Sequence, residues 1–584
     1  MAEGSGTETR LKNGPRRGNQ RPKLLAPKLQ TFFALPAAHI WQRLRQRLRQ
    51  PYYHSGLYHV SLGRRSSGEI KLPASEPWGG DDQAGLLLLG DEFRFAGEVV
   101  RSPKPLGNPI GVGDGWRQVV NSFAWLNDLR VVGGPYARQL ARQLVMRWIE
   151  ENERYDAFAW RADILAARLR NILLNHDYLE VNNDALFRSA LFLSLSRQAE
   201  HLSRALPDAL AGGAYIKAAA SLMLAGLMLP RGEKWLARGQ AHLAPALAAQ
   251  MLADGGHVER SPQLMLEVLQ HLIDLRDTFQ AAAAQLGNAA PSLPDSLVLT
   301  INNLGSVLLM LSHGDGMLAG FNDTPEIDPQ ELVRTIERVG EKLRPLNQLP
   351  LTGFQRLDRG RTTVIMDCGA PPRHGLDDHA HAGTLSFELG YDGERMIVNC
   401  GAHPWSKEWR QVQRTTAAHS TLVVDNTNSA MLLPHGGLAL RPDVVTCRRE
   451  ETDGQIWLDT SHDGYEEGFG LVHRRKIYLS ADGHDFMGEE HLVGPGGNEY
   501  ALRFHLHPQV SVSITQNGQN AFIKMPKGSG WRLRVDGAEL ALAESVHIAE
   551  GGQVRRSQQI VVLGTIESDR TEIRWLLQRE GGKK

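Results

Sequence analysis

The chain has 584 residues with 65 basic and 65 acidic side chains, so its formal net charge is zero. Hydrophobic residues make up 42% and charged residues 22%, a globular composition that excludes a mainly disordered chain. The neutral balance gives no reason to expect a nucleic-acid partner, and no apolar run approaches the ~18 residues of a transmembrane segment. Three cysteines are too few for a disulfide framework. The length predicts two or three domains.

Residues 1–50 form a basic arm with eleven Lys and Arg residues and two acidic ones, including QRLRQRLRQ at 42–50. Its apolar part is interrupted by Lys28 and two prolines, unlike a secretory signal peptide. We expect a disordered, solvated arm with one amphipathic helix. The alternative is peripheral attachment to an anionic surface, either a membrane or a polysaccharide. Without a recognisable signal peptide, a cytoplasmic location remains open.

Residues 51–345 are expected to form an α-helical domain. Apolar residues recur at four-residue steps, as in Leu140, Leu144 and Trp148, and breakers such as GGPY (133–136) and DGG (254–256) separate the helical segments. Antiparallel helices joined by short loops predict a bundle or a curved array of helical hairpins.

Residues 346–584 change to a strand pattern. Segments such as RTTVIMDCG, RRKIYLSADG and QQIVVLGTIE are rich in β-branched or alternating residues, with DG and NG turns between the strands. This predicts a large antiparallel β-sandwich, and so a multidomain α+β protein. A cleft between two such bodies is a common place for a long substrate.

The most informative stretch is DDHAHAGTLSFEL at 377–389. His379 and His381 are two residues apart, so an extended backbone would project both imidazoles to one side. Such a pair could bind a metal or carry protons, and the alternative is a surface strand whose histidines have no role. Asn399 and His419 begin or end nearby strands and could join them, although a neutral amide is a weak zinc ligand.

Arg414 lies five residues before His419. A guanidinium in this place could receive a substrate carboxylate, and the alternative is a salt bridge at a strand edge.

Four motifs together resemble the heparinase II/III family of polysaccharide lyases. They are DGGHVERSP (254–262), HAHAG with LSFEL (379–389), the glycine after Asn399, and RTTAAHST (414–421). The resemblance covers roughly residues 80–580. It implies an incomplete α/α toroid followed by an antiparallel β-sandwich, an acidic polysaccharide as substrate, and a cell-envelope or periplasmic setting.

The chemistry of this family is β-elimination, which removes the C5 proton of a uronic acid and expels the oxygen linked to C4. The enzyme must neutralise the carboxylate, place a base at C5 and protonate the leaving oxygen. The resemblance implies an Asn/His pair and a Tyr from the toroid, a His from the sandwich and, in some members, a structural zinc held by two His and one Asp.

This chain matches that set only in the sandwich. His379 matches the sandwich histidine, and His381 and His419 match the zinc-binding histidines, with Asn399 in place of the Asp. In the toroid, the family's S-P-x-Tyr-His reads Ser261-Pro262-Gln263-Leu264-Met265, and its Asn-x-His reads Gly213-Ala214-Tyr215. The chain therefore resembles a divergent branch that lacks the usual toroid residues.

Replacements are available near these positions. Tyr215 could serve as the acid and Arg260 as the carboxylate neutraliser, while Glu259 and His257 could contact substrate. The alternatives are that Tyr215 packs in the helical core and that Glu259 or Arg260 caps the helix after Pro262. Trp116 and Trp160 could stack on sugar rings, or they could belong to the core.

We therefore expect a polysaccharide lyase-like enzyme that cleaves an acidic, uronic-acid-containing glycan. His379 would carry the proton, Arg414 or Arg260 would bind the carboxylate, and Tyr215 would be the acid. No cofactor is required, and the predicted structural zinc at His381, Asn399 and His419 is a separate expectation. The alternative is a non-catalytic glycan-binding or envelope polysaccharide assembly protein on the same scaffold.

Overall fold

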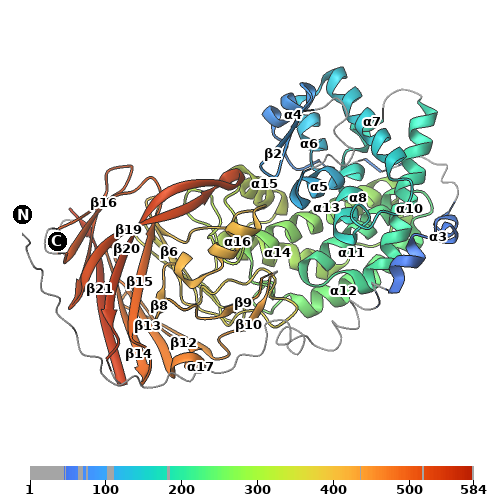
Figure 1. Cartoon of the computed structure of the whole chain (residues 1–584). Helices are drawn as coiled ribbons and strands as arrows, with labels where there is room; N and C mark the ends of the chain where they lie inside the picture. The colour runs from blue at the N-terminus through green and yellow to red at the C-terminus, as the bar shows by residue number, and fades with distance from the viewer. Residues whose placement is uncertain are drawn as a thin grey trace, which may run out of the picture.

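The structure, a computed structural model, describes residues 45, 48–63, 70, 72–73, 76–101, 111–180, 184–434, 436–515, 518–567 and 569–581. Most of the predicted basic arm, residues 1–44, lies outside the described residues. Helices gather at one end of the molecule and β-sheets at the other (Figure 1). This order, with a helical toroid first and antiparallel sheets second, confirms the predicted fold class.

In the helical half, helices begin and end at the glycine and proline residues that interrupt the hydrophobic pattern. Gly133, with φ of +68°, ends α6, and Pro135 lies in the first turn of α7. The half contains α3 (Gly56–Ser61), α4 (Asp82–Leu89), the hairpin β1 (Glu92–Phe95) and β2 (Glu98–Arg101), α5 (Asp114–Ser122), α6 (Leu126–Val132), α7 (Gly134–Glu151), α8 (Ala162–Leu174), α9 (His176–Leu179), α10 (Ala185–Ala209), α11 (Gly212–Met228), α12 (Glu233–Gln250), α13 (Pro262–Leu286), α14 (Asp295–Met310) and α15 (Pro329–Val339).

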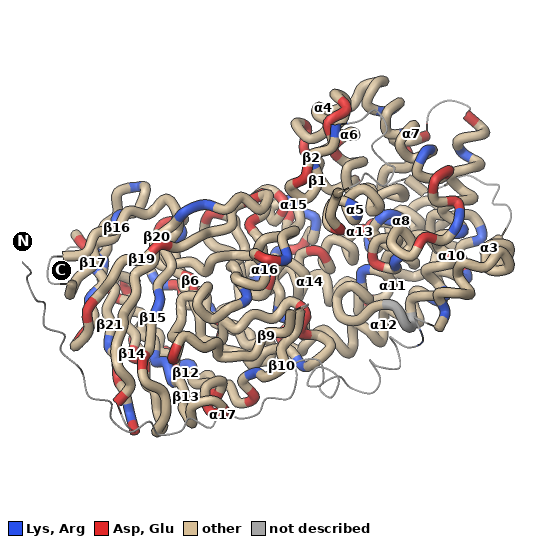
Figure 2. Tube along the Cα trace, viewed as in Figure 1, with Lys and Arg blue, Asp and Glu red and all other residues tan. Residues whose placement is uncertain are grey.

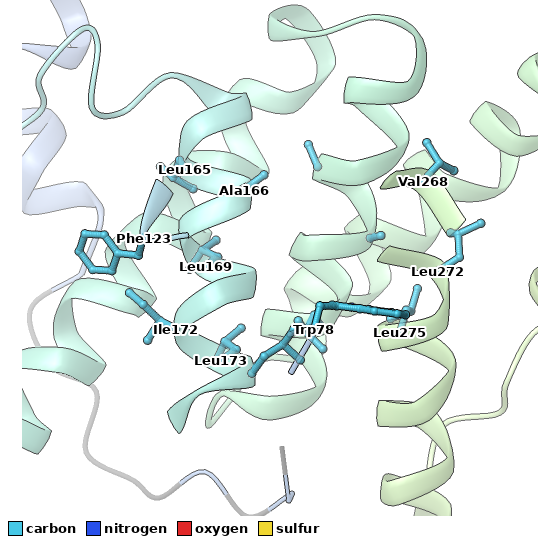
Figure 3. Packing of buried hydrophobic residues seen from close by; sticks show 14 of the residues in the cluster. Trp78, Phe123, Leu165, Ala166, Leu169, Ile172, Leu173, Val268, Leu272 and Leu275 are labelled. Atoms are coloured by element: carbon cyan, nitrogen blue, oxygen red, sulfur yellow. The ribbon is translucent and has the colours of Figure 1, made fainter. Parts of the chain in front are cut away.

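Helix α11 forms the centre of this half. Its consecutive residues 218–226 are all buried, because α8, α12 and α13 pack around it. Figure 3 shows apolar side chains of α8 and α13 in this core, with Trp78 between the two helices. The indole Nε1 of Trp78 donates to the carboxylate of Asp274 on α13 at 2.9 Å. Within the described residues, no helix is both long and apolar enough to cross a membrane.

The sandwich half consists of two large antiparallel sheets. One has the order β11-β12-β13-β14-β21-β18-β17-β16, and the other β19-β20-β15-β7-β6-β5-β4-β3 with β8 paired to β15. Their strands are β3 (Gln348–Leu349), β4 (Phe354–Arg359), β5 (Thr362–Asp367), β6 (Phe387–Tyr391), β7 (Glu394–Val398), β8 (Leu422–Val424), β11 (Val445–Thr452), β12 (Gln455–Tyr465), β13 (Leu471–Leu479), β14 (Asp485–Gly494), β15 (Glu499–Leu506), β16 (Ser511–Ile514), β17 (Asn520–Lys524), β18 (Gly530–Asp536), β19 (Glu539–Ala549), β20 (Gln553–Thr565) and β21 (Asp569–Glu580).

The two sheets enclose an aromatic core. Phe387 of β6 stacks on Trp575 of β21 with ring centroids 5.9 Å apart, and Phe486 and Phe504 meet the same indole edge-on. Such pairs add to the free energy gained by burying apolar area. Two short helices, α16 (Lys407–Gln413) and α17 (Glu466–Phe469), and the small hairpin of β9 (Met431–Leu432) and β10 (Leu438–Leu440) lie between the strands. Basic and acidic residues are interspersed over the described part of both halves (Figure 2).

Candidate functional site

The candidate site forms where the two halves meet. The helical half contributes the loop before α13 and the loop before α15, and the sandwich half contributes residues 377–383 and α16. Ser261 starts α13, because its hydroxyl accepts the backbone N–H of Leu264 at 3.4 Å while Pro262 takes the first helical position. The loop that ends at Ser261 thereby holds Glu259 toward the sandwich.

His379 lies between two carboxylates from the helical half. Its Nδ1 is 3.3 Å from Oδ2 of Asp323, and its Nε2 is 3.7 Å from Oε2 of Glu259. The side chain is 36% exposed, so the imidazole reaches solvent at the junction. Burial lowers the pKa of His379, but the hydrogen bond and charge of Asp323 and the charge of Glu259 outweigh it and raise the pKa above 6.5.

Asp323 is the hub of the site, although the sequence analysis did not single it out. Its carboxylate accepts from Nε of Arg410 at 2.9 Å, and its oxygens lie 3.3 Å from Nδ1 of His379 and 3.0 Å from Nε2 of His381. Burial raises the pKa of Asp323, but the hydrogen bond from His379 and the charge of Arg410 outweigh burial and hold the pKa well below the usual range. The carboxylate is therefore ionised at neutral pH.

The backbone at this hub is unusual. Asn322 and Asp323 both adopt left-handed conformations, with φ of +48° and +59°. Asn and Asp tolerate this region better than other side-chain-bearing residues, and such conformations cluster at functional sites. The Asn-Asp pair in FNDTP (321–325) was the sequence signal that could have identified Asp323. Arg410, one helical turn before Arg414, gave no comparable signal.

The predicted zinc residues form a chain of hydrogen bonds. Nδ1 of His419 bonds to the carbonyl of Thr415 at 2.8 Å, so its Nε2 accepts from Nδ1 of His381 at 3.1 Å. Nε2 of His381 in turn accepts the backbone N–H of Asp323 at 2.9 Å. Burial lowers the pKa of both His381 and His419, the latter to about 3, which keeps the pair neutral.

Asn399 completes the predicted zinc set only in part. Its Oδ1 accepts the backbone N–H of Ser420 at 3.0 Å, and its Nδ2 has no hydrogen-bond partner among the described residues. An amide oxygen already engaged in this way is a poor third ligand beside two imidazoles that bond to each other. The arrangement fits a neutral hydrogen-bonded pair better than a metal site, and zinc at these residues stays a prediction.

Arg414 is fully buried, and its guanidinium binds backbone carbonyl groups rather than an anion at the surface. Its guanidinium donates to the carbonyls of Ala380, Leu433 and Gly437 at 2.7 to 3.0 Å. These bonds fix the loop that carries His379. A substrate carboxylate could reach Arg414 only by displacing them.

Arg260 joins the two halves. It is buried, with φ of +58°, and donates to the carbonyl of Thr352 at 2.6 Å and to the buried carboxylate of Asp367 on β5. Neither the guanidinium nor its partner opens to the junction surface, since their side chains are 5% and 6% exposed. The helix after Pro262 is capped by Ser261, so Arg260 does not act as the cap.

Glu259 fills the space beside the start of α11. Its Oε1 accepts the backbone N–H of Gly213 at 2.7 Å. A Cβ atom built on Gly212, which has φ of +57°, would lie 1.8 Å from the same oxygen. Burial raises the pKa of Glu259, partly offset by the charge of His379.

Leu264 fills the neighbouring space. A Cβ atom on Gly213 would lie 2.8 Å from Cδ1 of Leu264. Two of the positions that differ from the family pattern, Gly213 and Leu264, therefore pack against each other. A larger side chain at Gly213 would collide with Leu264.

His257 and Tyr215 point to partners within the helical half. His257 is fully buried, with Nε2 bonded to Oε1 of Gln250 at 2.9 Å, and burial lowers its pKa to about 3. The Tyr215 hydroxyl bonds to Nδ1 of His242 at 2.7 Å, and burial raises its pKa. Tyr215 also lines a cavity of about 370 Å³ together with Gly212 and His374. Within the described residues, no hydrogen bond or ring contact joins Tyr215 to His379.

The two tryptophans differ in surroundings. Trp116 is 1% exposed and packs against Phe95 in the helical core. Trp160 is 3% exposed but lines a cavity of about 440 Å³ with Tyr53, Tyr155 and His201. Only Trp160 thus borders open space.

The arrangement brings together the carboxyl groups of Glu259 and Asp323, the imidazole of His379 and the guanidinium of Arg410. The two carboxyl groups favour the protonated form of His379, and a protonated imidazole can donate a proton but cannot accept one. The site offers no free guanidinium among the described residues of its centre to neutralise a uronate.

Sequence families and solved structures match nearly the whole chain. The family "Heparinase II/III N-terminus" matches residues 129–347 and "Heparinase II/III-like, C-terminal" matches residues 341–576. The chain is 28% identical over 575 residues to FtsZ-localized protein C of Caulobacter vibrioides, covering 93% of this chain and 96% of that protein.

Solved structures share the fold at low identity. Heparinase III superimposes with a TM-score of 0.68 at 15% identity, covering 95% of this chain and 94% of that chain. A mutant of the heparan sulfate lyase HepC from Pedobacter heparinus gives 0.59 at 16% identity, covering 96% and 89%.

Proposed function

Because this chain belongs to the heparinase II/III-like family, we propose that it is a binding protein built on a polysaccharide-lyase scaffold, which associates with FtsZ and does not perform β-elimination.

The observation that carries the proposal is the packing at the start of α11. Elimination needs polar groups from the toroid to neutralise the carboxylate and to protonate the leaving oxygen. At these positions the chain has Gly213 and Leu264, whose packing leaves no room for such groups, and Glu259 occupies the space over Gly212. A buried acid beside the substrate carboxylate would oppose uronate binding.

The state of His379 supports the same conclusion. Asp323 and Glu259 favour its protonated form, whereas a base at C5 must be neutral. Arg260 and Arg414, the two predicted carboxylate contacts, are engaged with buried partners.

The association with FtsZ rests on the relative that matches over nearly its full length and whose name places it with FtsZ. The proposed association with FtsZ also predicts the cellular location of the chain. A chain that associates with FtsZ is expected in the same compartment as FtsZ, and the envelope or periplasmic setting implied by the family resemblance stays an alternative. A glycan contact on the junction is compatible with either place.

A lyase is the second candidate, because His379 is retained and reaches solvent at the junction. In that case Tyr215, which lines the neighbouring cavity, would protonate the leaving oxygen, and Arg410 would be the cation nearest the carboxylate. His379 would have to lose the proton on Nε2 before it could act as a base, with Asp323 still bonded to Nδ1.

The deciding experiment pairs two measurements on the purified protein. It is incubated with uronic-acid polysaccharides while the ultraviolet absorbance of an unsaturated uronate is followed, with heparinase III as positive control. It is also sedimented with FtsZ polymers. Cosedimentation without absorbance is the expected result. Absorbance that His379→Ala abolishes would overturn the proposal in favour of the lyase.

A further inference from the structure

Two of the three cysteines lie on opposite sheets at one edge of the sandwich. Cys368 directly follows β5 in one sheet, and Cys447 lies on β11, the last strand of the other sheet. Cys368 is 5% exposed and packs with Met366 in the core between the sheets. Cys447 is exposed at the edge. The two sheets therefore present one buried thiol and one thiol that solvent reaches.

The register of β11 turns Cys447 toward the opposite sheet. Cys447 pairs with Thr460 of β12, which is fully buried. Arg449, two residues later, pairs with Leu458 of the core. Alternate residues of a strand share one face, so Cys447 and Arg449 point the same way. Nη1 of Arg449 donates to Oε1 of Gln355 on β4 at 3.2 Å, so this face of β11 meets the sheet that contains β4 and β5.

Two contacts bracket the cysteines. On one side is the hydrogen bond from Arg449 to β4. On the other side, the guanidinium of Arg441 donates to the carbonyl of Pro372. Cys447 lies between Arg441 and Arg449 along the chain, and Cys368 lies four residues before Pro372. The two thiols meet between these contacts and hydrogen-bond to each other.

The surroundings make Cys447 the more reactive thiol. Its hydrogen bond with Cys368 and the charge of Arg449 lower the pKa of Cys447 below 9.0, although burial opposes them. Burial raises the pKa of Cys368 well above its usual value, and it raises the pKa of the third cysteine, Cys400, to about 11. Two pKa units correspond to about 10²-fold in the thiolate fraction at neutral pH. The thiolate is the nucleophile, so Cys447 reacts first.

We propose that Cys447 and Cys368 form a reversible disulfide when the protein meets hydrogen peroxide. This goes beyond the proposed function and holds whether or not the chain has lyase activity. The Cys447 thiolate attacks one peroxide oxygen, the O–O bond breaks, and a sulfenic acid forms while the released hydroxide takes up a proton as water. The Cys368 sulfur then attacks the sulfenic sulfur, so that the S–S bond forms, the S–O bond breaks and the thiol proton leaves with the oxygen as a second water. The two thiols lose two electrons, and the peroxide gains them.

The bond would fasten an edge strand to the segment that joins the two halves. β11 is the last strand of its sheet, and its partner would be the residue after Asp367, whose carboxylate binds Arg260. A disulfide between distant residues restricts the unfolded chain. Oxidation is therefore expected to raise the melting temperature, and a dithiol reductant should reverse the change.

The test uses the purified full-length chain, reduced and then treated with hydrogen peroxide. Peptides prepared without reductant should include a linked pair that contains Cys368 and Cys447 and is lighter by two hydrogen atoms than the two reduced peptides together. A dithiol reductant should separate the pair. With limiting iodoacetamide at neutral pH, the reduced chain should be alkylated at Cys447 at least about 10²-fold faster than at Cys400.

Two variants and a denaturant provide the controls. Cys447→Ser should prevent the link, and Cys400→Ser should form it as fast as wild type. In urea the thiols are no longer held together, so the link should close more than about tenfold more slowly. The wild-type peptides decide the outcome even if a variant folds poorly. The proposal is overturned if peroxide leaves Cys368 reduced, if Cys400 replaces Cys368 in the link, if the link joins two chains, or if it closes equally fast in urea.

Discussion

Among the single residues of the junction, Asp323 has the largest effect on the charges of its neighbours. One carboxylate faces two imidazoles and the guanidinium of Arg410, in a place where water is largely excluded. In such a setting a charge is stable only when its partners are fixed. The state of His379 is therefore imposed by a residue from the other half of the molecule.

The first prediction concerns the protonation of His379. Its folded pKa is raised above 6.5, so the stabilising interaction with Asp323 is present below the unfolded pKa and is lost as the pH rises through the folded pKa. An imidazole NMR titration should give a pKa above 6.5 for His379, and Asp323→Asn should lower it. The melting temperature lost in His379→Gln should shrink as the pH rises. A wild-type pKa below 6.5 would contradict this.

The second prediction concerns Arg414. Arg414→Ala leaves three buried carbonyls without their donor, and each such group costs ~1–3 kcal/mol, so we expect a loss of several kcal/mol of unfolding free energy, measured by denaturant titration. Arg448→Ala, at a side chain that is 79% exposed, is the matched control and should change stability by less than about 0.5 kcal/mol. A variant that is stable but binds glycan less would instead make Arg414 a substrate contact.

At the scale of elements, the starts of α11 and α13 form one packed unit. Gly213 on α11 and Leu264 on α13 touch, and Glu259 bonds to the Gly213 N–H. Each helix start limits the side chains that the other can carry. A change at one position alone is therefore expected to strain the other.

The third prediction tests this unit. Gly213→Asn places a Cβ 2.8 Å from Leu264 and should destabilise the protein by ~1–3 kcal/mol through overpacking. Leu264→Ala in the same chain should recover part of the loss, because it opens the space. Gly56→Asn is the control, since it also lies in a first helical turn and a Cβ there meets nothing within 4 Å. Equal melting temperatures for both asparagine variants would disprove the packing argument.

At the scale of the whole molecule, polar contacts hold the two halves together, and one of them is a buried ion pair. The carboxylate of Asp254 accepts the backbone N–H groups of Leu351 and Thr352 at 2.8 and 2.7 Å, and Arg260 pairs with Asp367. Breaking one partner of a buried ion pair is costly because a charge is left uncompensated. The halves are therefore expected to move as one body on the time scale of ligand binding.

The fourth prediction concerns the basic arm, whose residues 1–44 lie outside the described residues. Arg43→Glu together with Arg47→Glu should weaken binding to anionic vesicles or polyanions in cosedimentation at low salt, and 0.5 M salt should abolish the difference because the charges are then screened. The melting temperature should not change. Unaltered binding at low salt would leave the arm without a role in attachment.

The sequence by itself determined the order of the two halves, the family and the retained His379, because hydrophobic period and short motifs are local properties of the chain. It also showed that Gly213 and Leu264 depart from the family pattern. The tertiary structure decided the roles of the side chains. Arg414 and Arg260 are buried and bind backbone carbonyls, whereas Asp323 and Arg410 belong to the candidate site. Each of the four contacts residues that lie 34 to 110 positions away in the sequence. Which distant segments meet is set by the packing of the whole chain, and no local pattern records it.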